Sequence, residues 1–462
     1  MILPPVGEPA RPPAAAGPRR IRCAVSLAAV VLFTCCSSAG APPARTSIEF
    51  WHAMRGAGTT ALEALVQQFN ESQPAVAVKP IFKGTYPEVL TAAITAYQRK
   101  APPHLAQVFD IGTLSMLRSH AIVPVYRLME QQQISVNWAD ILPTVTAYYA
   151  ENSRLYSLPF NASTPILYYN KAIFRKAGLP VAPPATWPAV EAAAQRILAT
   201  GAASCGFTTG GSPSWGLLEN AFPWHDHPFA TNQNGYDGLD TRLLLNSDFG
   251  RMHVRALARW HRARIFESGG QEGRAERFAQ GACAMAVASS GEIGGFARSL
   301  PFDWGTGPLP HWGPPYPKAN TMVGGATLWV FRGHSAPEYR GVAQFLKFLA
   351  DPRQQAWWAA TTGFLPITKT ALDNLDEGGF YKQNPEQWTA MTQLLNAEPT
   401  ANSRGLRLGN YAEVREAIEL ELDNILAGRK TVEDGLATAV ARGNAILREF
   451  AVTHGAAAQG EI

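Results

Sequence analysis

Predicted strands and helices alternate in the segment that follows residue 45, and this order constrains the fold more than any other feature. Strand-like and helix-like patterns follow one another over residues 46–54, 58–74, 75–84, 85–103 and 104–110. A β-α-β-α-β order implies parallel strands with helices on both faces of the sheet. Ligands of such sheets bind beyond the carboxyl ends of the strands. The sequence therefore predicts an α/β fold with a binding edge near the ends of these strands.

The chain has 462 residues, which is too many for one compact core. A second α/β unit begins near residue 161, and later strand-like segments return to the sheets. We therefore predict two hinged lobes, each a mostly parallel sheet flanked by helices, with the ligand cleft between them. The expected first lobe comprises residues 46–160 plus about 287–335. The expected second lobe comprises residues 161–286 plus about 336–452, and residues 453–462 form a tail.

The N-terminal segment, residues 1–40, has the pattern of a secretory signal and leader. A basic region (Arg19, Arg20, Arg22) precedes a short apolar stretch, and small residues follow up to Ala41. This pattern predicts export to the periplasm. Residues 32–35 loosely resemble a lipoprotein cleavage box, so lipid anchoring is an alternative. No other run of about 18 apolar residues is present, so we predict a mature protein without a membrane span.

Cysteine usage agrees with export. Three of the five cysteines lie in the leader, which leaves Cys205 and Cys283 in the mature chain. Two cysteines in an exported protein favour one disulfide, and we predict a Cys205–Cys283 bridge. Two separate buried thiols are the alternative.

Several chemistries have no signature in this sequence. It contains no phosphate-binding G-x-x-x-x-G-K-[ST] loop, no G-x-S-x-G elbow and no H-E-x-x-H zinc motif. His225 and His227 lie two residues apart, which is a weak metal signal. The net charge of +4 arises from 40 basic and 36 acidic residues without a basic stripe, so nucleic acid is not an expected partner. A chain of this kind is expected to be a monomeric, cofactor-free binding protein rather than an enzyme.

Seven segments, in chain order, resemble one protein family: EFWHAM, FKGTYPEVL, PFNASTPILYYNKAIFRKAGLP, GACAMAVASSG, GGATLWV, TTGFLPITK and RGLRLGNYAEVR. They are similar to the periplasmic sn-glycerol-3-phosphate-binding proteins of ABC importers. These proteins belong to the large extracellular solute-binding family that includes maltose-binding protein. The resemblance covers nearly all of residues 46–450. It implies a hinged two-lobe fold, a periplasmic location and delivery of the ligand to permease subunits in the inner membrane.

The resemblance also implies a set of ligand contacts. The matching positions supply hydroxyl donors, a carboxylate, an aromatic wall and a close backbone approach: Tyr86, Asp110, Ser163, Trp215, Ser289 and Gly325. Asp110 and Trp215 would face the glycerol, and the two serines and Gly325 the phosphate. Arg415 is the preferred phosphate partner by spacing, and Arg407 is the alternative. Each residue also has a structural interpretation, for example a turn for Ser163 or a helix-end packing role for Tyr86.

Two departures from the family pattern bear on the ligand. Phe364 stands where the family has a tyrosine, and Ser212 stands where it has a tryptophan. The first removes a phosphate donor, and the second widens the pocket. Together they favour a larger, less charged ligand, so we predict a glycerophosphodiester such as glycerophosphocholine. Glycerol 3-phosphate is the close alternative, and an oligosaccharide is the alternative within the same superfamily.

Overall fold

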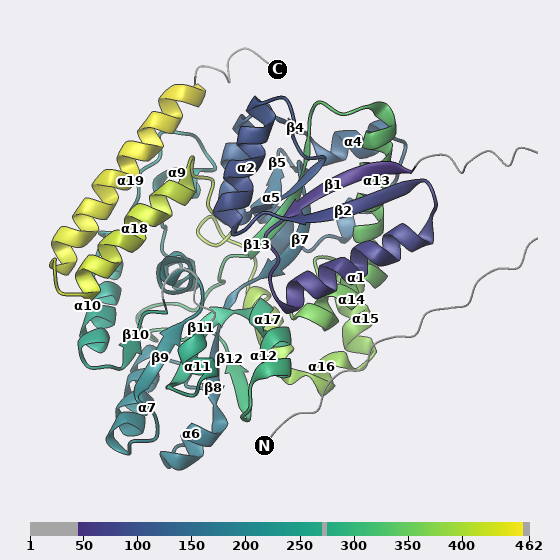
Figure 1. Ribbon diagram of the computed structural model, residues 1–462. Helices are drawn as coiled ribbons and strands as arrows, with labels where there is room; N and C mark the ends of the chain where they lie inside the picture. Colours follow the sequence, from purple (N-terminus) through teal and green to yellow (C-terminus); the bar gives the residue numbers. More distant parts are fainter. Residues whose placement is uncertain (1–44, 270–274, 456–462) are drawn as a thin grey trace, which may run out of the picture. The chain divides into compact units, whose positions relative to one another are not determined.

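The computed structural model describes residues 45–269 and 275–455, which belong to one compact unit. The signal sequence and leader predicted for residues 1–40 lie outside the described residues, as does most of the predicted tail. The described chain forms two main β-sheets and a small two-stranded one (Figure 1). No helix in the described ranges is both long enough and apolar enough to cross a membrane.

The first sheet starts with the predicted β-α-β-α-β order. Its first elements are β1 (Thr46–His52), α1 (Ala57–Ser72), β2 (Val76–Phe82), α2 (Tyr86–Gln98) and β3 (Leu105–Phe109). β1 lies between β2 and β3 and pairs in parallel with both. The helix α2 begins where the sequence predicted because Thr85 and Glu88 form a capping box at its first turn. The carboxyl ends of β1, β2 and β3 therefore meet at one edge of the sheet.

Antiparallel strands from later in the chain complete this first sheet. β13 (Gly324–Phe331) pairs with β3, with β4 (Ile122–Val123) and with β7 (Leu158–Ser163). The segment between β3 and β7 contains short elements: η1 (Asp110–Gly112), α3 (Thr113–Arg118), α4 (Val125–Gln131), η2 (Trp138–Asp140), α5 (Pro143–Tyr149), β5 (Ala150–Glu151) and β6 (Arg154–Leu155). The α/β prediction is confirmed, and the sheet is mixed because β13 runs against β3.

The second sheet has the strand order β10-β9-β11-β8-β12. Its strands are β8 (Pro165–Asn170), β9 (Cys205–Thr209), β10 (Phe266–Glu267), β11 (Cys283–Ser289) and β12 (Trp304–Gly307). β9 pairs in parallel with β10 and β11, whereas β8 is antiparallel to β11 and β12. The helical segments between them are α6 (Lys171–Lys176), α7 (Trp187–Ala199), η3 (Trp215–Glu219), α8 (Ala221–Trp224), α9 (Thr231–Gly235), α10 (Asp248–Arg262), α11 (Glu276–Ala279), η4 (Ser290–Glu292) and α12 (Ile293–Ser299).

The remainder of the chain is helical. It contains α13 (Ala336–Leu349), α14 (Pro352–Thr362), α15 (Lys369–Glu377), α16 (Phe380–Gln383), α17 (Pro385–Leu394), α18 (Tyr411–Leu426) and α19 (Val432–Gly455). α13 packs on β1, and α14 packs on α1. The Phe345 ring of α13 lies 5.0 Å from that of Phe69 and 6.1 Å from that of Phe50, centroid to centroid.

Strand pairing and helix packing differ from the expected lobe boundaries at two places. Residues 287–335 were predicted to belong with the first lobe, but β12 pairs with β8 in the second sheet. Residues 336–452 were predicted to belong with the second lobe, but α13 and α14 pack on elements of the first sheet. The position of α13 follows from the packing of Phe345 on Phe50 of β1 and Phe69 of α1, a contact between distant segments that periodicity alone does not reveal.

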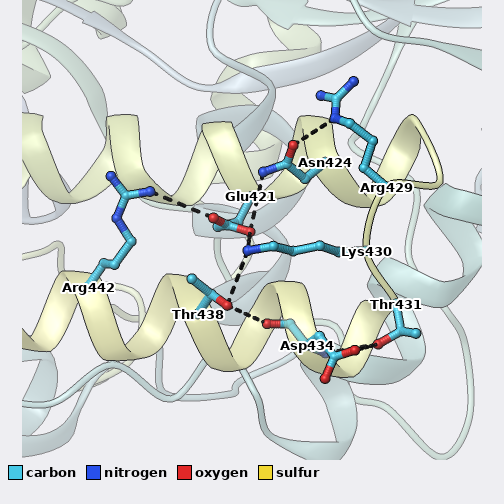
Figure 2. Close-up of polar contacts among 8 residues, drawn as sticks. All are labelled: Glu421, Asn424, Arg429, Lys430, Thr431, Asp434, Thr438 and Arg442. Atoms are coloured by element: carbon cyan, nitrogen blue, oxygen red, sulfur yellow. Dashed lines mark hydrogen bonds and ion pairs between the residues drawn. The ribbon is translucent and has the colours of Figure 1, made fainter.

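The helices α18 and α19 form a hairpin whose inner face holds a buried carboxylate (Figures 1 and 2). Glu421 is 3 % exposed and accepts from Lys430 at 2.7 Å, while Arg442 of α19 lies 3.7 Å from its other oxygen. Lys430 also donates to Thr438 at 3.3 Å, so the loop and both helices are joined (Figure 2). Because a buried carboxylate requires partners of this kind, the network fixes α18 against α19.

The predicted disulfide between Cys205 and Cys283 is confirmed. The two cysteines face each other across the parallel pair β9 and β11, and both side chains are fully buried. The bridge closes a loop of 78 residues, and a covalent link across a loop of this length restricts the unfolded chain strongly.

We expect a Cys205→Ala/Cys283→Ala double variant to lose about 2–4 kcal/mol in free energy of unfolding relative to the oxidised protein. Urea denaturation followed by circular dichroism measures this loss. As a control, a reductant should leave the double variant unchanged and lower the midpoint of the wild type. Equal stability of the double variant and the oxidised wild type, or two titratable thiols in unfolded, unreduced wild type, would contradict the prediction.

Candidate functional site

A cavity of about 370 Å³ lies where the ends of several strands and one C-terminal helix meet. Its wall includes residues from both main sheets and from α18. Nine of the ten residues predicted to contact a ligand line this cavity: Tyr86, Asp110, Ser163, Ser212, Trp215, Ser289, Gly325, Phe364 and Arg415. The folded chain therefore brings together residues that are spread over more than 300 positions of the sequence.

Arg407 does not line the cavity. Its side chain is 2 % exposed and donates from Nη2 to the carbonyl oxygens of Tyr148 at 2.8 Å and Ala150 at 2.7 Å. The guanidinium also lies 5.1 Å from the ring of Tyr236. Arg407 thus ties the end of α5 to the C-terminal segment, and Arg415 is the arginine of the two that the fold presents to the cavity.

Arg415 is held by a buried carboxylate that the sequence analysis did not single out. Glu219 is 1 % exposed, and its two oxygens accept from Nε of Arg415 at 2.8 Å and from Nη2 at 2.6 Å. Burial opposes the charge of Arg415, but the adjoining Glu219 carboxylate raises the pKa of Arg415 above its usual value. This bidentate pairing fixes the plane of the guanidinium, so its remaining nitrogen has a defined direction.

Asp110 begins η1 at the carboxyl end of β3, and it is 6 % exposed. Burial raises the pKa of Asp110 to about 7, although the positive charge of Arg415 acts in the opposite direction. A carboxyl group in this setting can accept hydrogen bonds from hydroxyl groups of a ligand. Because Asp110 is buried among few donors of its own, we expect its protonation state to follow pH near neutrality.

Tyr86 is oriented by a buried chain of amides. Nε2 of Gln107 donates to Oδ1 of Asn161 at 2.7 Å, and Nδ2 of Asn161 donates to the Tyr86 hydroxyl at 2.8 Å. Burial raises the pKa of Tyr86 to about 12, so the phenol keeps its proton. Since its oxygen already accepts from Asn161, its hydrogen is left to point elsewhere. Tyr86 therefore serves as a donor at the cavity wall.

The two serines and Gly325 occupy adjoining strand ends. Ser163 is the last residue of β7 and lies opposite Gly324 in the β7–β13 pair. Oγ of Ser289 accepts from the amide of Gly291 at 3.1 Å, which leaves its hydrogen for donation. Gly325 has φ = 109°, and a Cβ there would overlap the carbonyl oxygen of Asn161. Only glycine fits this backbone, which lets the cavity wall approach a ligand closely.

Ser212 and two glutamates form another part of the wall. Oγ of Ser212 donates to Oε1 of Glu419, and it accepts from the amide of Trp215 at 3.1 Å. Burial raises the pKa of Glu419. Glu416 lines the cavity as well. Neither glutamate was predicted from the sequence, because glutamates one and four positions after Arg415 on α18 are ordinary for a solvent-facing helix.

Phe364 packs its ring against the backbone of Gly291 and lies parallel to Trp358 at a centroid distance of 6.0 Å. The ring has no polar atom, so this part of the wall is apolar. A tyrosine here would extend one hydroxyl from the same ring position.

Two groups of possible metal ligands converge among the described residues. One contains Cys205 and Cys283, whose sulfurs are joined in the disulfide. The other is His104 with His334 and Glu338. Nδ1 of His104 accepts from a backbone amide at 3.1 Å, so its Nε2 carries the proton and faces Glu338 at 3.3 Å. This tautomer offers no lone pair to a metal.

The weak metal signal at His225 has a structural explanation. Its Nδ1 lies 2.7 Å from the carbonyl oxygen of Ala221, and its Nε2 accepts from the amide of Trp312 at 2.9 Å. Burial lowers the pKa of His225 to about 3. Both nitrogens are therefore occupied by the backbone, and the ring stays neutral.

Comparison with known proteins places this arrangement in one class, the two-lobe solute-binding fold. UgpB from Mycobacterium tuberculosis, solved in complex with glycerophosphocholine, matches with a TM-score of 0.75 and 24% identity, covering 88% of this chain and 99% of that one. The GacH receptor of Streptomyces glaucescens matches with a TM-score of 0.73 and 18% identity, covering 88% and 100%. At these identities the likeness concerns the fold.

Sequence comparison gives the family. Residues 64–390 match the model of the bacterial extracellular solute-binding proteins. The sn-glycerol-3-phosphate-binding periplasmic protein UgpB of Rhizobium meliloti is 40% identical over 408 residues, covering 87% of this chain and 94% of the relative. The Escherichia coli protein of the same name is 40% identical over 416 residues, covering 89% and 94%. The chain belongs to the bacterial extracellular solute-binding family, whose members are binding proteins and not enzymes.

The pKa of Asp110 predicts how stability depends on pH. The folded state binds this proton more tightly than the unfolded state, whose aspartate pKa is the ordinary 3.8. The ligand-free protein should therefore lose stability as pH rises from about 4 to about 7, by about 1.4 kcal/mol for each unit of pKa difference. Asp110→Asn removes this loss. The melting temperature of the variant minus that of the wild type should therefore be larger at pH 8 than at pH 4.5.

Differential scanning calorimetry across this pH range checks the prediction, with Asp423→Asn as a control at an exposed aspartate of α18. The control should follow the wild type at every pH. A constant difference between Asp110→Asn and the wild type would contradict the assignment.

Proposed function

We propose that this chain is the ligand-capturing component of an ABC importer and that it binds a glycerophosphate ester, with a glycerophosphodiester such as glycerophosphocholine preferred over sn-glycerol 3-phosphate. The observation that carries the proposal is the cavity wall itself. One arginine fixed by a buried carboxylate shares this wall with Ser163, Ser289 and Gly325. The names of the relatives at 40% identity, sn-glycerol-3-phosphate-binding proteins, support the same ligand class.

The phosphate would bind at the side of the cavity that carries hydrogen-bond donors. Ser163 and Ser289 would donate from their hydroxyls, and the free nitrogen of Arg415 would supply a charge-assisted bond. The backbone at Gly325 would approach the phosphate without steric hindrance. Such donors are what a buried phosphate needs to replace its lost hydration.

The glycerol would bind at the side of the cavity that carries Asp110, Tyr86 and Trp215. Asp110 would accept from glycerol hydroxyls, and Tyr86 would donate to one of them. The indole of Trp215 would cover the carbon skeleton. Ligand contacts on both sheets would favour the closed form of the two lobes, because each contact is complete only when the cleft is closed.

Charge favours the diester. A phosphate monoester carries a charge of about −1.5 to −2 at pH 7, whereas a diester carries a single charge. Glu219 already neutralises Arg415, and the wall also contains Glu416 and Glu419. Arg55 is the other arginine of the wall, so the lining carries more carboxyl groups than arginines. A second negative charge on the ligand is therefore disfavoured, and a positively charged head group would meet the acidic part of the wall.

Two wall residues add to this preference. Phe364 provides no hydroxyl for phosphate, and the loss of one such donor typically costs about 1–3 kcal/mol. Ser212 leaves space next to Trp215 that a bulky ring would fill. This space, bordered by Glu419, would take the head group of a diester.

The family implies a small ligand and permease partners, and the remaining assignments are our proposal. We propose that the protein is exported to the periplasm, acts there as a monomer, requires no cofactor and does not bind nucleic acid. Lipid anchoring through the leader is the alternative mode of retention. An oligosaccharide is the alternative ligand, because relatives of the same fold were solved with sugars.

A ligand panel tests the proposed function. In isothermal titration calorimetry we expect glycerophosphocholine to bind at least tenfold more tightly than sn-glycerol 3-phosphate, and maltose to give no heat. Tight binding of glycerol 3-phosphate without any heat from glycerophosphodiesters would contradict the diester preference. Binding of maltose alone would replace the proposal with the sugar alternative. Release of choline on incubation would indicate an enzyme instead.

Substitution of the two arginines separates their roles. Arg415→Lys keeps the charge but loses the planar fork, so we expect at least a tenfold loss of affinity for glycerophosphocholine. Arg407→Lys is the matched control, and its affinity should stay within about twofold of the wild type. Lysine is preferable to alanine at position 415, since alanine would leave Glu219 buried without a partner. The opposite outcome, with affinity lost only in Arg407→Lys, would contradict the assignment.

A further inference from the structure

A buried amide lies behind the cavity wall, where the chain crosses between the two main sheets. Gln393, on α17, is 2 % exposed. Its Oε1 accepts from the amide of Leu309 at 2.6 Å, and its Nε2 donates to the carbonyl oxygen of Pro165 at 2.8 Å. Because one partner is a backbone donor and the other a backbone acceptor, the orientation of the amide is fixed.

The same amide contacts two segments that connect the sheets. Nε2 of Gln393 lies 3.2 Å from Oγ1 of Thr164, in the junction between β7 and β8. It lies 3.1 Å from Oγ1 of Thr321, in the connection from β12 to β13. The two threonine hydroxyls are also hydrogen-bonded to each other at 2.7 Å. One side chain therefore holds two crossing segments that are more than 150 residues apart in sequence.

Two residues of this hydrogen-bonded region are the direct sequence neighbours of the two cavity serines. Thr164 directly follows Ser163, and Ser290 directly follows Ser289. The amide of Ser290 donates to the carbonyl oxygen of Thr164 at 2.9 Å, and the amide of Thr164 donates to Oγ of Ser290 at 3.3 Å. The backbones that carry the two cavity serines are thus locked to each other, and Gln393 holds the pair from behind.

We propose that Gln393 is a positioning residue for the ligand site: it fixes the two crossing segments on the second sheet and thereby sets the relative position of Ser163 and Ser289. The helix α17 packs on β8 and β12, so the anchor belongs to the second sheet. The consequence for binding rests on the proposed function, because it assumes that these serines contact the phosphate. The hydrogen-bond network itself does not depend on that assumption.

Gln393→Glu tests the proposal with almost no change in shape. At pH 8 the carboxylate turns an oxygen toward the carbonyl of Pro165, which repels it, and the network loses its donor. At pH 5 the buried carboxyl takes up a proton and can donate again. We expect the affinity for glycerophosphocholine, relative to wild type at the same pH, to fall at least tenfold at pH 8 and to recover to within about threefold at pH 5.

Two further variants complete the design. Gln393→Met removes all hydrogen bonds of the amide without adding charge, and it serves if the glutamate variant does not fold at pH 8. Gln387→Glu, at a partly exposed position of the same helix, is the control and should keep wild-type affinity at both pH values. Ligand-free hydrogen exchange should become faster in peptides covering residues 158–170 and 285–293 of either Gln393 variant, and it should stay unchanged in the control.

Each outcome either supports or overturns the positioning role of Gln393. Faster exchange in these peptides with a pH-reversible loss of affinity supports the positioning role. Unchanged exchange in both Gln393 variants overturns it, and so does faster exchange with wild-type affinity. If the wild type binds no glycerophosphate ester at all, the proposed function fails, and the exchange measurement still decides whether Gln393 holds the two serine segments.

Discussion

The ion pair between Arg415 and Glu219 is the interaction on which the cavity depends. Glu219 comes from the turn η3 after the second sheet's β9, and Arg415 comes from α18 near the C-terminus. Glu219 is buried, Arg415 is 13 % exposed at the cavity wall, and their contact is bidentate. A buried pair of this kind is costly to break because either partner alone would be an uncompensated charge. The cavity therefore contains a fixed ion pair before any ligand binds.

This ion pair determines which ligand groups the remaining wall can bind. Asp110 lies close enough for the charge of Arg415 to oppose the rise in its pKa, and the same guanidinium acts on Glu219 and Glu419. The charge of Arg415 is thus partly balanced before a ligand binds, and Arg55 is the other arginine of the wall. Directed hydrogen bonds from neutral groups add to these charges in the recognition of a phosphate. Neutral donors discriminate by geometry, which suits a ligand with a single phosphate charge and a separate head group.

The α/β class, the first β-α-β-α-β unit and the disulfide were predicted from the sequence and are confirmed, because local periodicity and the number of cysteines indicate them. Nine of the ten predicted ligand contacts line the cavity, because they belong to motifs that keep their order, such as Ser163 in the segment NAST and Gly325 in GGA. Their contact with a ligand stays a prediction. The features that were not predicted depend on contacts between distant segments of the chain. The assignment of β12 and α13 to their sheets required knowledge of which apolar surfaces meet.

The same limit applies inside the site. Glu219, Glu419 and Asn161 lie next to predicted residues in space but carry no pattern of their own, since glutamates on a helix and an asparagine in a strand have many ordinary uses. Arg407 and Arg415 lie eight positions apart in a shared motif, and only the fold separates a structural arginine from one at the cavity.

The disulfide has a consequence beyond the loop that it closes. It joins the amino-terminal ends of β9 and β11, and the opposite ends of these parallel strands carry Thr209 and Ser289 toward the cavity. A slip of one residue between the strands would turn every side chain of β11 to the other face, and Ser289 would leave the cavity wall. The cross-link forbids that slip. In an oxidising compartment the bridge therefore fixes the register of β9 and β11, and with it the position of Ser289 at the cavity wall several residues away.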